Sequence, residues 1–364
     1  MYTPKKRIAK FNLAFIIILF ISFGLNAQKE SNYSLLWKIE GNNLKAPSYL
    51  FGTMHIDDER AFNFSDAVLP AIKSCSKFAL EVQPDSLIMK MIHKKSEEKA
   101  YLTYKKLLTD KEFKKLSKRF LEVNGYPIEE SEEYDPNTLV TQLHPEENKD
   151  TDKATFVDLH LLGHAKTMQK EIIGLEDIDS QLNYFENLTK EDKREFILSQ
   201  FKYDVSDYKK ELEMLTKVYL TGDLNEINRV LENYDGYDLE LEQRNKVMCN
   251  SIINQIKSGS LFSAVGAAHL PGSIGLINML KEKGYKVTAV EANFTGVADN
   301  YQIDDSKMKW FNNYFENLGY AVETPGVISR DSSNTDFNVN TYVDFSSYKT
   351  YSFFAIDLRG QLTN

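Results

Sequence analysis

Apolar residues along the chain alternate between short continuous runs and longer stretches in which they recur every three or four positions, which predicts a mixed α/β fold. Two runs, 34–40 and 48–54, flank Gly41-Asn42-Asn43 and predict a β-hairpin. Further strands are predicted at 77–82, 171–175, 261–265 and 285–291. Helices are predicted near 65–74, 153–170, 224–231, 239–256 and 272–283. We therefore expect a central mixed sheet with surrounding helices, and the last β-α-β unit has the short connections of a parallel pair.

Residues 85–145 depart from this pattern because charged side chains dominate them. Thr109-x-x-Glu112 predicts a capping box, and Gly125 predicts the end of a helix. We interpret the segment as a helical insertion. Two hypotheses stay open for it, a lid over the functional site and a helical surface that is merely solvated.

From about residue 304 the pattern changes again, to apolar residues at every second position. Such runs occupy 339–345 and 350–356 and predict a small β-rich appendage without an assigned role. The expected organisation is therefore a main domain over 28–300, which contains the helical insertion, followed by a C-terminal appendage over 301–364.

The first 27 residues have the features of a targeting segment. Four basic residues fall within the first ten, an apolar run covers 11–25, and Ala27 precedes a suitable cleavage point. The apolar run is close to the short limit for a membrane span, so an uncleaved N-terminal anchor is the alternative to a signal peptide. We expect an exported protein, periplasmic or extracellular, that contacts a membrane only through this segment.

The composition of the remaining 337 residues limits the classes of function. They carry 40 basic and 53 acidic side chains, so the formal charge falls from −9 to −13. Such a chain is poorly suited to binding nucleic acid through phosphate contacts. Only two cysteines occur, Cys75 and Cys249, which is too few for a zinc–cysteine site. In an exported protein they either form a disulfide or stay as two buried thiols.

The strongest candidate chemistry is a motif that occurs twice. Residues 49–55 and 262–269 are apolar runs that end in Gly-x-x-His, so His55 and His269 are expected where two buried strands end. Glu81 is expected at the end of a third strand. Two imidazoles and one carboxylate leave an open position on a divalent metal, where a bound water is activated for attack on a carbonyl. The alternative is that each histidine only caps its strand and that Glu81 pairs with an arginine.

Two further features accompany the second motif. Arg244 lies in a predicted helix that leads to this motif, where it could neutralise Glu81 or hold substrate, although a solvated arginine fits the spacing equally well. After His269, a helix that opens near Pro271 would direct its positive end toward the site.

Other polar residues are weaker candidates. His160 and His164 share a helix face with the spacing of zinc-binding helices, but no glutamate lies between them, so we expect a structural pair. Glu176-Asp177 ends a predicted strand, and its role stays open.

Short motifs in a fixed order carry a family resemblance. They are Leu-Phe-Gly-Thr-Met-His at 50–55, Ala-Leu-Glu-Val at 79–82, Asp-x-x-Leu-x-x-x-Ala at 158–165, Gly-Leu-Glu at 174–176, Gly-Asp-Leu at 222–224, Arg-Asn at 244–245 and Val-Gly-Ala-Ala-His-Leu-Pro-Gly at 265–272. With these motifs, residues 34–292 resemble the TraB/GumN family, which is related to the TIKI metalloproteases. The resemblance implies a fold similar to the erythromycin-esterase/ChaN-like group, and it implies His55, Glu81, His269 and Arg244 as catalytic residues.

The same resemblance implies a function. Its link to TIKI implies metal-dependent cleavage of a peptide or protein substrate near the N-terminus, by a hydrolase with His55, Glu81 and His269 as metal ligands. Manganese or cobalt is the expected metal, and zinc is an alternative. Two other functions stay open. One is non-catalytic binding that sequesters a peptide signal, and the other is metal-free ester hydrolysis with His55 as general base.

Overall fold

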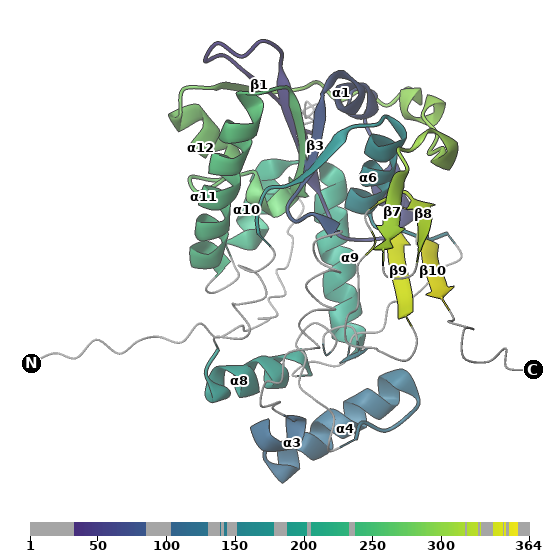
Figure 1. The fold of residues 1–364 in the computed structure, drawn as a ribbon. Coiled ribbons are helices and arrows are strands. Elements are labelled where there is room, and N and C mark those ends of the chain that lie inside the picture. The colour runs from purple at the N-terminus through teal and green to yellow at the C-terminus, as the bar shows by residue number, and fades with distance from the viewer. Residues whose placement is uncertain are drawn as a thin grey trace, which may run out of the picture.

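A computed structural model of the chain describes residues 33–84, 103–129, 139, 142–143, 151–177, 188–201, 205–232, 237–316, 319–326, 328, 338–344, 346 and 349–355. The predicted targeting segment lies outside these residues. Within them, a six-stranded sheet with helices on both faces forms the main body, and a group of helices and two β-hairpins lie beside it (Figure 1). The predicted fold class, a mixed sheet with surrounding helices and a β-rich C-terminal part, is confirmed.

The sheet has the strand order β4-β3-β5-β2-β1-β6. Its strands are β1 (Leu36–Glu40), β2 (Ser48–Thr53), β3 (Lys77–Leu80), β4 (Glu171–Gly174), β5 (Leu261–Gly266) and β6 (Lys286–Ala289). β4, β3, β5 and β2 pair in parallel, whereas β1 pairs antiparallel with both β2 and β6. All strands of this sheet except β1 therefore point the same way, and their last residues lie at one edge, which we call the carboxyl edge.

The predicted β-hairpin is confirmed, whereas the two strands of the predicted last β-α-β unit are parallel without being neighbours. β1 and β2 form the hairpin, with Asn42 and Asn43 at positive φ values of 46° and 60°, which asparagine tolerates better than most residues. β5 and β6 are parallel as expected, but they are not neighbours. The hairpin strands β2 and β1 lie between them, because β6 pairs with the outer strand of the hairpin.

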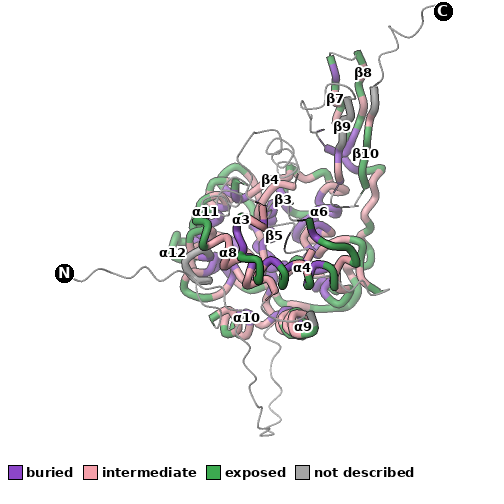
Figure 2. Tube along the Cα trace, turned by 90° about the horizontal axis from the view of Figure 1, so that it is seen from below, coloured by how far each residue is buried: buried purple, intermediate pink, exposed green. Residues whose placement is uncertain are grey.

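Helices cover both faces of the sheet (Figures 1 and 2). α1 (Val68–Ser74) packs on α6 (Val157–Thr167), which contacts β3 and β5, while α11 (Tyr237–Ile256) and α12 (Leu276–Glu282) pack together on the other side. β5 is buried along Leu261–Val265, as a central parallel strand with both faces covered should be. α10 (Leu224–Leu231) lies next to the end of β5. Single 3-10 turns occupy Glu59–Phe62, Ala267–His269, Val297–Asn300 and Asp305–Lys307.

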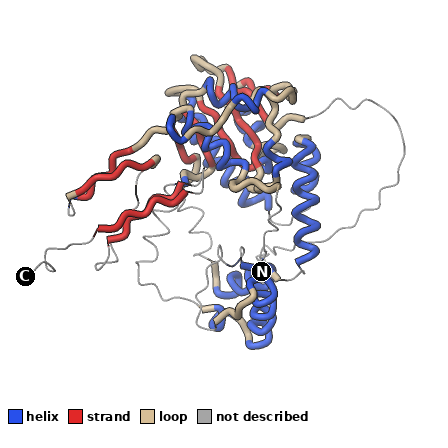
Figure 3. The backbone as a smooth tube through the Cα atoms, turned by 90° about the vertical axis from the view of Figure 1, so that its right-hand side faces the viewer, coloured by secondary structure: helices blue, strands red, loops and turns tan. Residues whose placement is uncertain are grey.

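Three helices form a second core on the side of the carboxyl edge. α3 (Tyr104–Leu107) and α4 (Asp110–Asn124), from the predicted insertion, pack with α8 (Lys190–Gln200), which lies outside it. We call these three helices the helical unit. α4 begins with the predicted capping box and ends at Gly125, whose φ is 75°. α9 (Val205–Thr221) extends between the sheet and this unit (Figures 1 and 3). The role of the insertion as a lid over the functional site stays a prediction.

Two β-hairpins make up the described part of the C-terminal appendage (Figure 3). They are β7 (Phe311–Phe315) with β8 (Tyr320–Thr324), and β9 (Asn338–Asp344) with β10 (Lys349–Ala355). The appendage is attached to α6 through Lys166, whose Nζ donates to Asp344 at 2.9 Å and to the Tyr342 hydroxyl at 3.1 Å. Asp344 is buried and the Lys166 side chain is 11 % exposed, so the contact holds the appendage against the main body.

The two cysteines do not form a disulfide. Cys75 and Cys249 are both free and buried, so of the two alternatives the buried thiols are correct. Among the described residues, no helix is long and apolar enough to cross a membrane.

Candidate functional site

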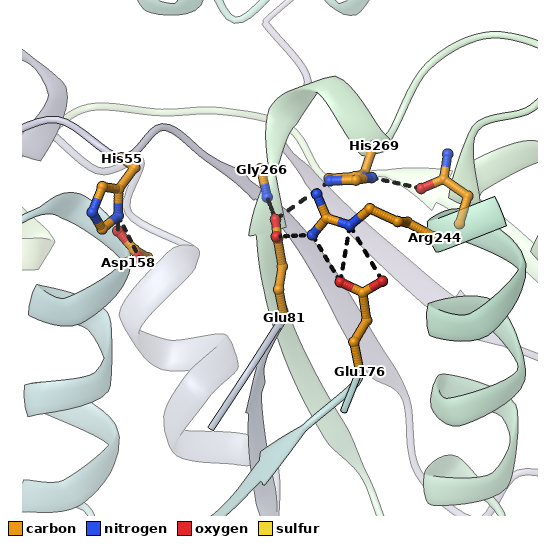
Figure 4. Close-up of polar contacts among 8 residues, drawn as sticks. His55, Glu81, Asp158, Glu176, Arg244, Gly266 and His269 are labelled. Atoms are coloured by element: carbon orange, nitrogen blue, oxygen red, sulfur yellow. Dashed lines mark hydrogen bonds and ion pairs between the residues drawn. The ribbon is translucent and has the colours of Figure 1, made fainter. Parts of the chain in front are cut away.

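Polar side chains from strand ends and from α11 meet at the carboxyl edge (Figure 4). Glu81 directly follows β3, and Glu176 lies two residues beyond β4. His269 is the last residue of the 3-10 turn that follows β5. Arg244 and Asn245 are consecutive residues of α11 and approach the edge from the side. We call these five residues the edge cluster.

Glu81 occupies the centre of the edge cluster. One carboxylate oxygen, Oε1, accepts the backbone N–H of Gly266 at 2.7 Å, and the other, Oε2, accepts Nη2 of Arg244 at 2.6 Å. A Cβ atom at position 266 would lie 3.2 Å from Oε1. The glycine of the second motif therefore lets the carboxylate approach the backbone closely enough to accept its N–H.

Arg244 bridges two carboxylates. Its Nη2 donates to Oε2 of Glu176 at 2.7 Å as well as to Glu81, and its Nε donates to the same Glu176 oxygen at 3.1 Å. The Glu176 side chain is only 2 % exposed, and this guanidinium pairs with its charge. With both carboxylates ionised, the three side chains carry a net charge of −1, which favours a cation or a positively charged substrate group at this edge.

The cluster shifts the ionisation of its members. Burial by itself would raise the pKa of Glu81, but the His269 imidazole, the Arg244 guanidinium and the Gly266 N–H outweigh it and lower the pKa below its usual range. Burial lowers the pKa of His269, although Glu81 opposes this effect. Glu176 and Glu81 keep the pKa of Arg244 above its usual range despite burial. At neutral pH the site therefore holds an ionised Glu81 beside a neutral His269.

His269 has a defined tautomer. Asn245 donates its Nδ2 to the carbonyl of Ile274 at 2.7 Å, which turns its Oδ1 toward Nδ1 of His269, also at 2.7 Å. Because an amide oxygen can only accept, Nδ1 of His269 carries the proton and Nε2 carries the lone pair. Nε2 lies 3.5 Å from Oε1 of Glu81. The histidine of the second motif therefore presents a basic nitrogen to the site.

His55 lies at the same edge but apart from the edge cluster (Figure 4). Its Nδ1 is 3.1 Å and 3.2 Å from the two carboxylate oxygens of Asp158, which belongs to α6, and its ring stacks on Phe156 with 3.9 Å between centroids. The side chain is 63 % exposed. Asp158 orients the ring through Nδ1, as Asn245 does for His269.

The two Gly-x-x-His motifs pack against each other. β2 and β5 are parallel neighbours in which Thr53 lies opposite Gly266. A Cβ atom on Gly52 would lie 3.1 Å from Ala267, which begins the turn carrying His269. The glycine of the first motif thus makes room for the turn of the second motif. The hydroxyl of Tyr219 on α9 also donates to the carbonyl of Gly52, at 3.2 Å.

The comparison with known families agrees with this arrangement. The family model described as TraB/PrgY/gumN matches residues 35–289, more than two thirds of the chain. The chain belongs to the TraB/PrgY/gumN family. The match to this family contains the whole edge cluster together with His55 and Asp158, while the C-terminal hairpins lie beyond it. No curated protein and no solved structure matches the chain.

Sequence analysis of this TraB/PrgY/gumN family member indicates four site residues, and the structure brings three of them together. Glu81, Arg244 and His269 are in contact, while His55 pairs with Asp158. Within the described parts of the chain, no three His, Cys, Asp or Glu residues are grouped closely enough to hold a metal ion. The metal-ligand set of His55, Glu81 and His269 therefore stays a prediction.

One sequence prediction about this family member is wrong. The helix after His269 does not begin near Pro271, because Gly272, at a φ of 80°, belongs to an intervening turn. α12 begins only at Leu276, with Gly275 as its N-cap residue. The positive end of this helix is therefore separated from His269 by the turn.

His160 and His164 lie on α6 beside aromatic rings, and their structural role stays a prediction. Their Nε2 atoms are 3.3 Å apart, and His160 packs on the rings of Phe62 and Phe64. Burial lowers the pKa of both histidines to about 4, so both are neutral at physiological pH.

Three residues of the site have roles that the sequence did not indicate. Glu176 was recognised as a strand-end residue without a role, while Asn245 and Asp158 were only parts of family motifs. The signal for Asn245 is its position directly after Arg244, which the sequence does indicate. Asp158 had no such signal, because its partner lies 103 positions away in the sequence.

Proposed function

We propose that the protein is an exported metal-dependent hydrolase that acts on peptides or on the N-terminal region of proteins. The observation that carries the proposal is the matched orientation of the two motif histidines. Nδ1 of each is held by an acceptor from a neighbouring helix, Asp158 for His55 and Asn245 for His269. Histidines that bind a metal through Nε2 are commonly oriented by such a partner.

The donor set fits a divalent metal in its chemistry. It offers Nε2 of His55, Nε2 of His269 and the ionised carboxylate of Glu81, which together suit manganese, cobalt or zinc. Only Glu81 and His269 are in contact in the described arrangement. A metal bound by these residues would supply a water with a lowered pKa and a Lewis acid for the substrate carbonyl.

The chain's own residues would bind and orient the substrate. Arg244 uses Nε and Nη2 for the two carboxylates, and its Nη1 donates to no described residue. This N–H group can donate to a substrate oxygen on which negative charge develops. Glu176 keeps the guanidinium in place, and the net negative charge of the edge favours the ammonium group of a peptide N-terminus.

The test is a peptide-library assay read by mass spectrometry, with and without EDTA and with added manganese or cobalt. We expect new peptide ends that disappear with EDTA and return with the metal. A separate measurement, metal content by elemental analysis, should show metal loss in a His55→Ala/His269→Ala double variant. His144→Ala, at a histidine without a predicted role, is the matched control and should keep its metal. Full metal retention by the double variant would exclude this ligand set.

One observation favours a second candidate, metal-free ester hydrolysis. The exposed His55 with Nδ1 on Asp158 has the arrangement of a general base with an orienting carboxylate. In that case EDTA leaves ester hydrolysis unchanged, and Asp158→Asn lowers the rate without changing metal content.

A further inference from the structure

The outer face of α4 is strongly basic. Lys111, Lys114, Lys115 and Lys118 recur at intervals of three and four, so they share one side of the helix, and all four are exposed. The opposite side carries the buried residues of the second core, Phe113, Leu116 and Phe120. Figure 2, which views the molecule from below, shows exposed positions along α4. The basic face is therefore available to a partner and is not used in packing the helical unit.

This charge pattern works against the stability of the helix. Lys111 and Lys115, like Lys114 and Lys118, are four residues apart, and like charges at this spacing destabilise a helix. Lys111 also lies in the first turn, where the positive end of the helix dipole disfavours a cation. Among the described residues, none of the four lysines forms an ion pair. Asp110 lies four residues before Lys114, and the exposed Glu122 lies four residues after Lys118 on the same side of the helix. These opposite charges offset part of the repulsion, so helix stability alone does not account for four lysines on this face.

The basic face contrasts with the rest of the chain. Residues 103–129 contain seven basic and four acidic side chains, whereas the chain without its first 27 residues has a formal charge of −13. At physiological ionic strength charges act over about 8 Å, so a surface that approaches α4 meets a local positive field. An anionic partner is the one that this field attracts.

We propose that this face of α4 docks onto a bilayer surface that carries anionic phospholipid headgroups. Two exposed apolar side chains support a bilayer over other polyanions. Leu121, on the edge of the basic face, is 49 % exposed, and Tyr126, just past the end of the helix, is 55 % exposed. Basic residues with adjacent Leu and aromatic side chains are typical of elements that lie in a membrane interface. The acidic remainder of the chain opposes wrapping by a nucleic acid.

Docking in this way would orient the molecule. The helical unit lies on the side of the carboxyl edge, at the far end of α9 (Figures 1 and 3). A bilayer bound at α4 would therefore lie on the side of the carboxyl edge, with the helical unit between the bilayer and the candidate site. The inference extends the sequence expectation of membrane contact through the N-terminal segment alone, and it does not depend on the proposed chemistry.

The experiment measures binding of the full chain to vesicles of phosphatidylglycerol and phosphatidylcholine in equal parts, and to vesicles of phosphatidylcholine alone. The test variant replaces the four lysines of the basic face with glutamine, at Lys111, Lys114, Lys115 and Lys118. The matched control replaces four exposed lysines at the opposite end of the sheet with glutamine, at Lys45, Lys257, Lys283 and Lys286. All three proteins keep the N-terminal segment, so its contribution is the same in each.

We expect the test variant to bind the phosphatidylglycerol vesicles at least tenfold more weakly than the wild type, because each lysine near an anionic surface contributes roughly fivefold. The control variant should bind like the wild type, and added salt should remove the difference. Equal binding by test and control variants would overturn the proposal. So would a loss seen only with duplex DNA or heparin, which would identify a soluble polyanion. The melting temperature checks folding, and it should stay unchanged or rise because like charges are removed.

Discussion

Replacing Arg244 with methionine should destabilise the folded protein more than the same replacement of an exposed arginine would. Methionine keeps the length of the side chain but removes the positive charge that bridges Glu81 and Glu176. Glu176 is 2 % exposed and Glu81 is 27 % exposed, so neither carboxylate can recover its lost interaction fully from water. Both would stay partly buried without a cation, which is the costly way to break a buried ion pair.

The expected loss is about 3 kcal/mol in the free energy of unfolding, at the lower end of the range for a broken buried pair. The lower end applies because Arg244 is 28 % exposed and Glu81 27 %, so solvent already screens part of that interaction. For a domain of this size the loss corresponds to a fall of about 6–12 °C in melting temperature. Arg229, which pairs with Glu226 on the surface of α10, is the matched control. Arg229→Met should change stability by less than about 1 kcal/mol.

The pH dependence gives a second readout with a definite sign. In the wild type the pKa of Glu81 is lowered, so its contribution is fully present above the ordinary value of 4.5 and is lost as the pH falls below it. Without Arg244, the effect of burial on Glu81 is opposed less and the pKa of Glu81 rises, so protonation of this carboxylate relieves the defect. Urea unfolding at about pH 7.5 and about pH 5.5 should therefore show a smaller difference between variant and wild type at the lower pH. A defect that equals that of Arg229→Met, or that grows in acid, would refute this reasoning.

Three further predictions concern parts of the molecule outside the edge cluster. Gly222→Ala should destabilise by more than about 2 kcal/mol, because position 222 has a φ of 61° and a Cβ atom there would lie 2.2 Å from the Tyr33 ring; thermal unfolding measures it. Cys75 and Cys249 should react with a thiol reagent only on unfolding, because both are buried and burial raises the pKa of Cys75 to about 11; fast labelling of the native protein would contradict this. Thr109→Ala removes the capping box of α4 and should weaken hydrogen-exchange protection there by about 1 kcal/mol, with no change in β5.

Single helices and hairpins could be predicted where the residues that determine them are close together in the sequence. The β1–β2 hairpin follows from two apolar runs around Gly41-Asn42-Asn43, and α4 follows from its capping box and Gly125. α10 matches its predicted span of 224–231 residue for residue. In each case the residues that determine the element lie within it or directly beside it, so no information about distant parts of the chain is needed.

The candidate site was only partly predictable, because it depends on the order of strands in the sheet. Glu81 and His269 meet since β3 and β5 are neighbours, and the pattern of apolar residues does not encode that order. The contact of His55 with Asp158 depends in the same way on where α6 packs. The predicted start of α12 is too early because Pro271 suits the first turn of a helix, whereas in the structure Pro271-Gly272 belongs to a turn, which the same dipeptide also indicates.

Arg244 and Asn245 are neighbours on one rigid helix, and this has a consequence for any attempt to alter the site. Charge compensation of the two glutamates and the orientation of His269 are set by a single rotational position of α11. Inserting one residue into the helix ahead of Arg244 would rotate both side chains by about 100° around the axis. The guanidinium and the amide would then leave the edge together. Moving this helix therefore cannot change the charge compensation of the two glutamates without also changing the orientation of the His269 imidazole.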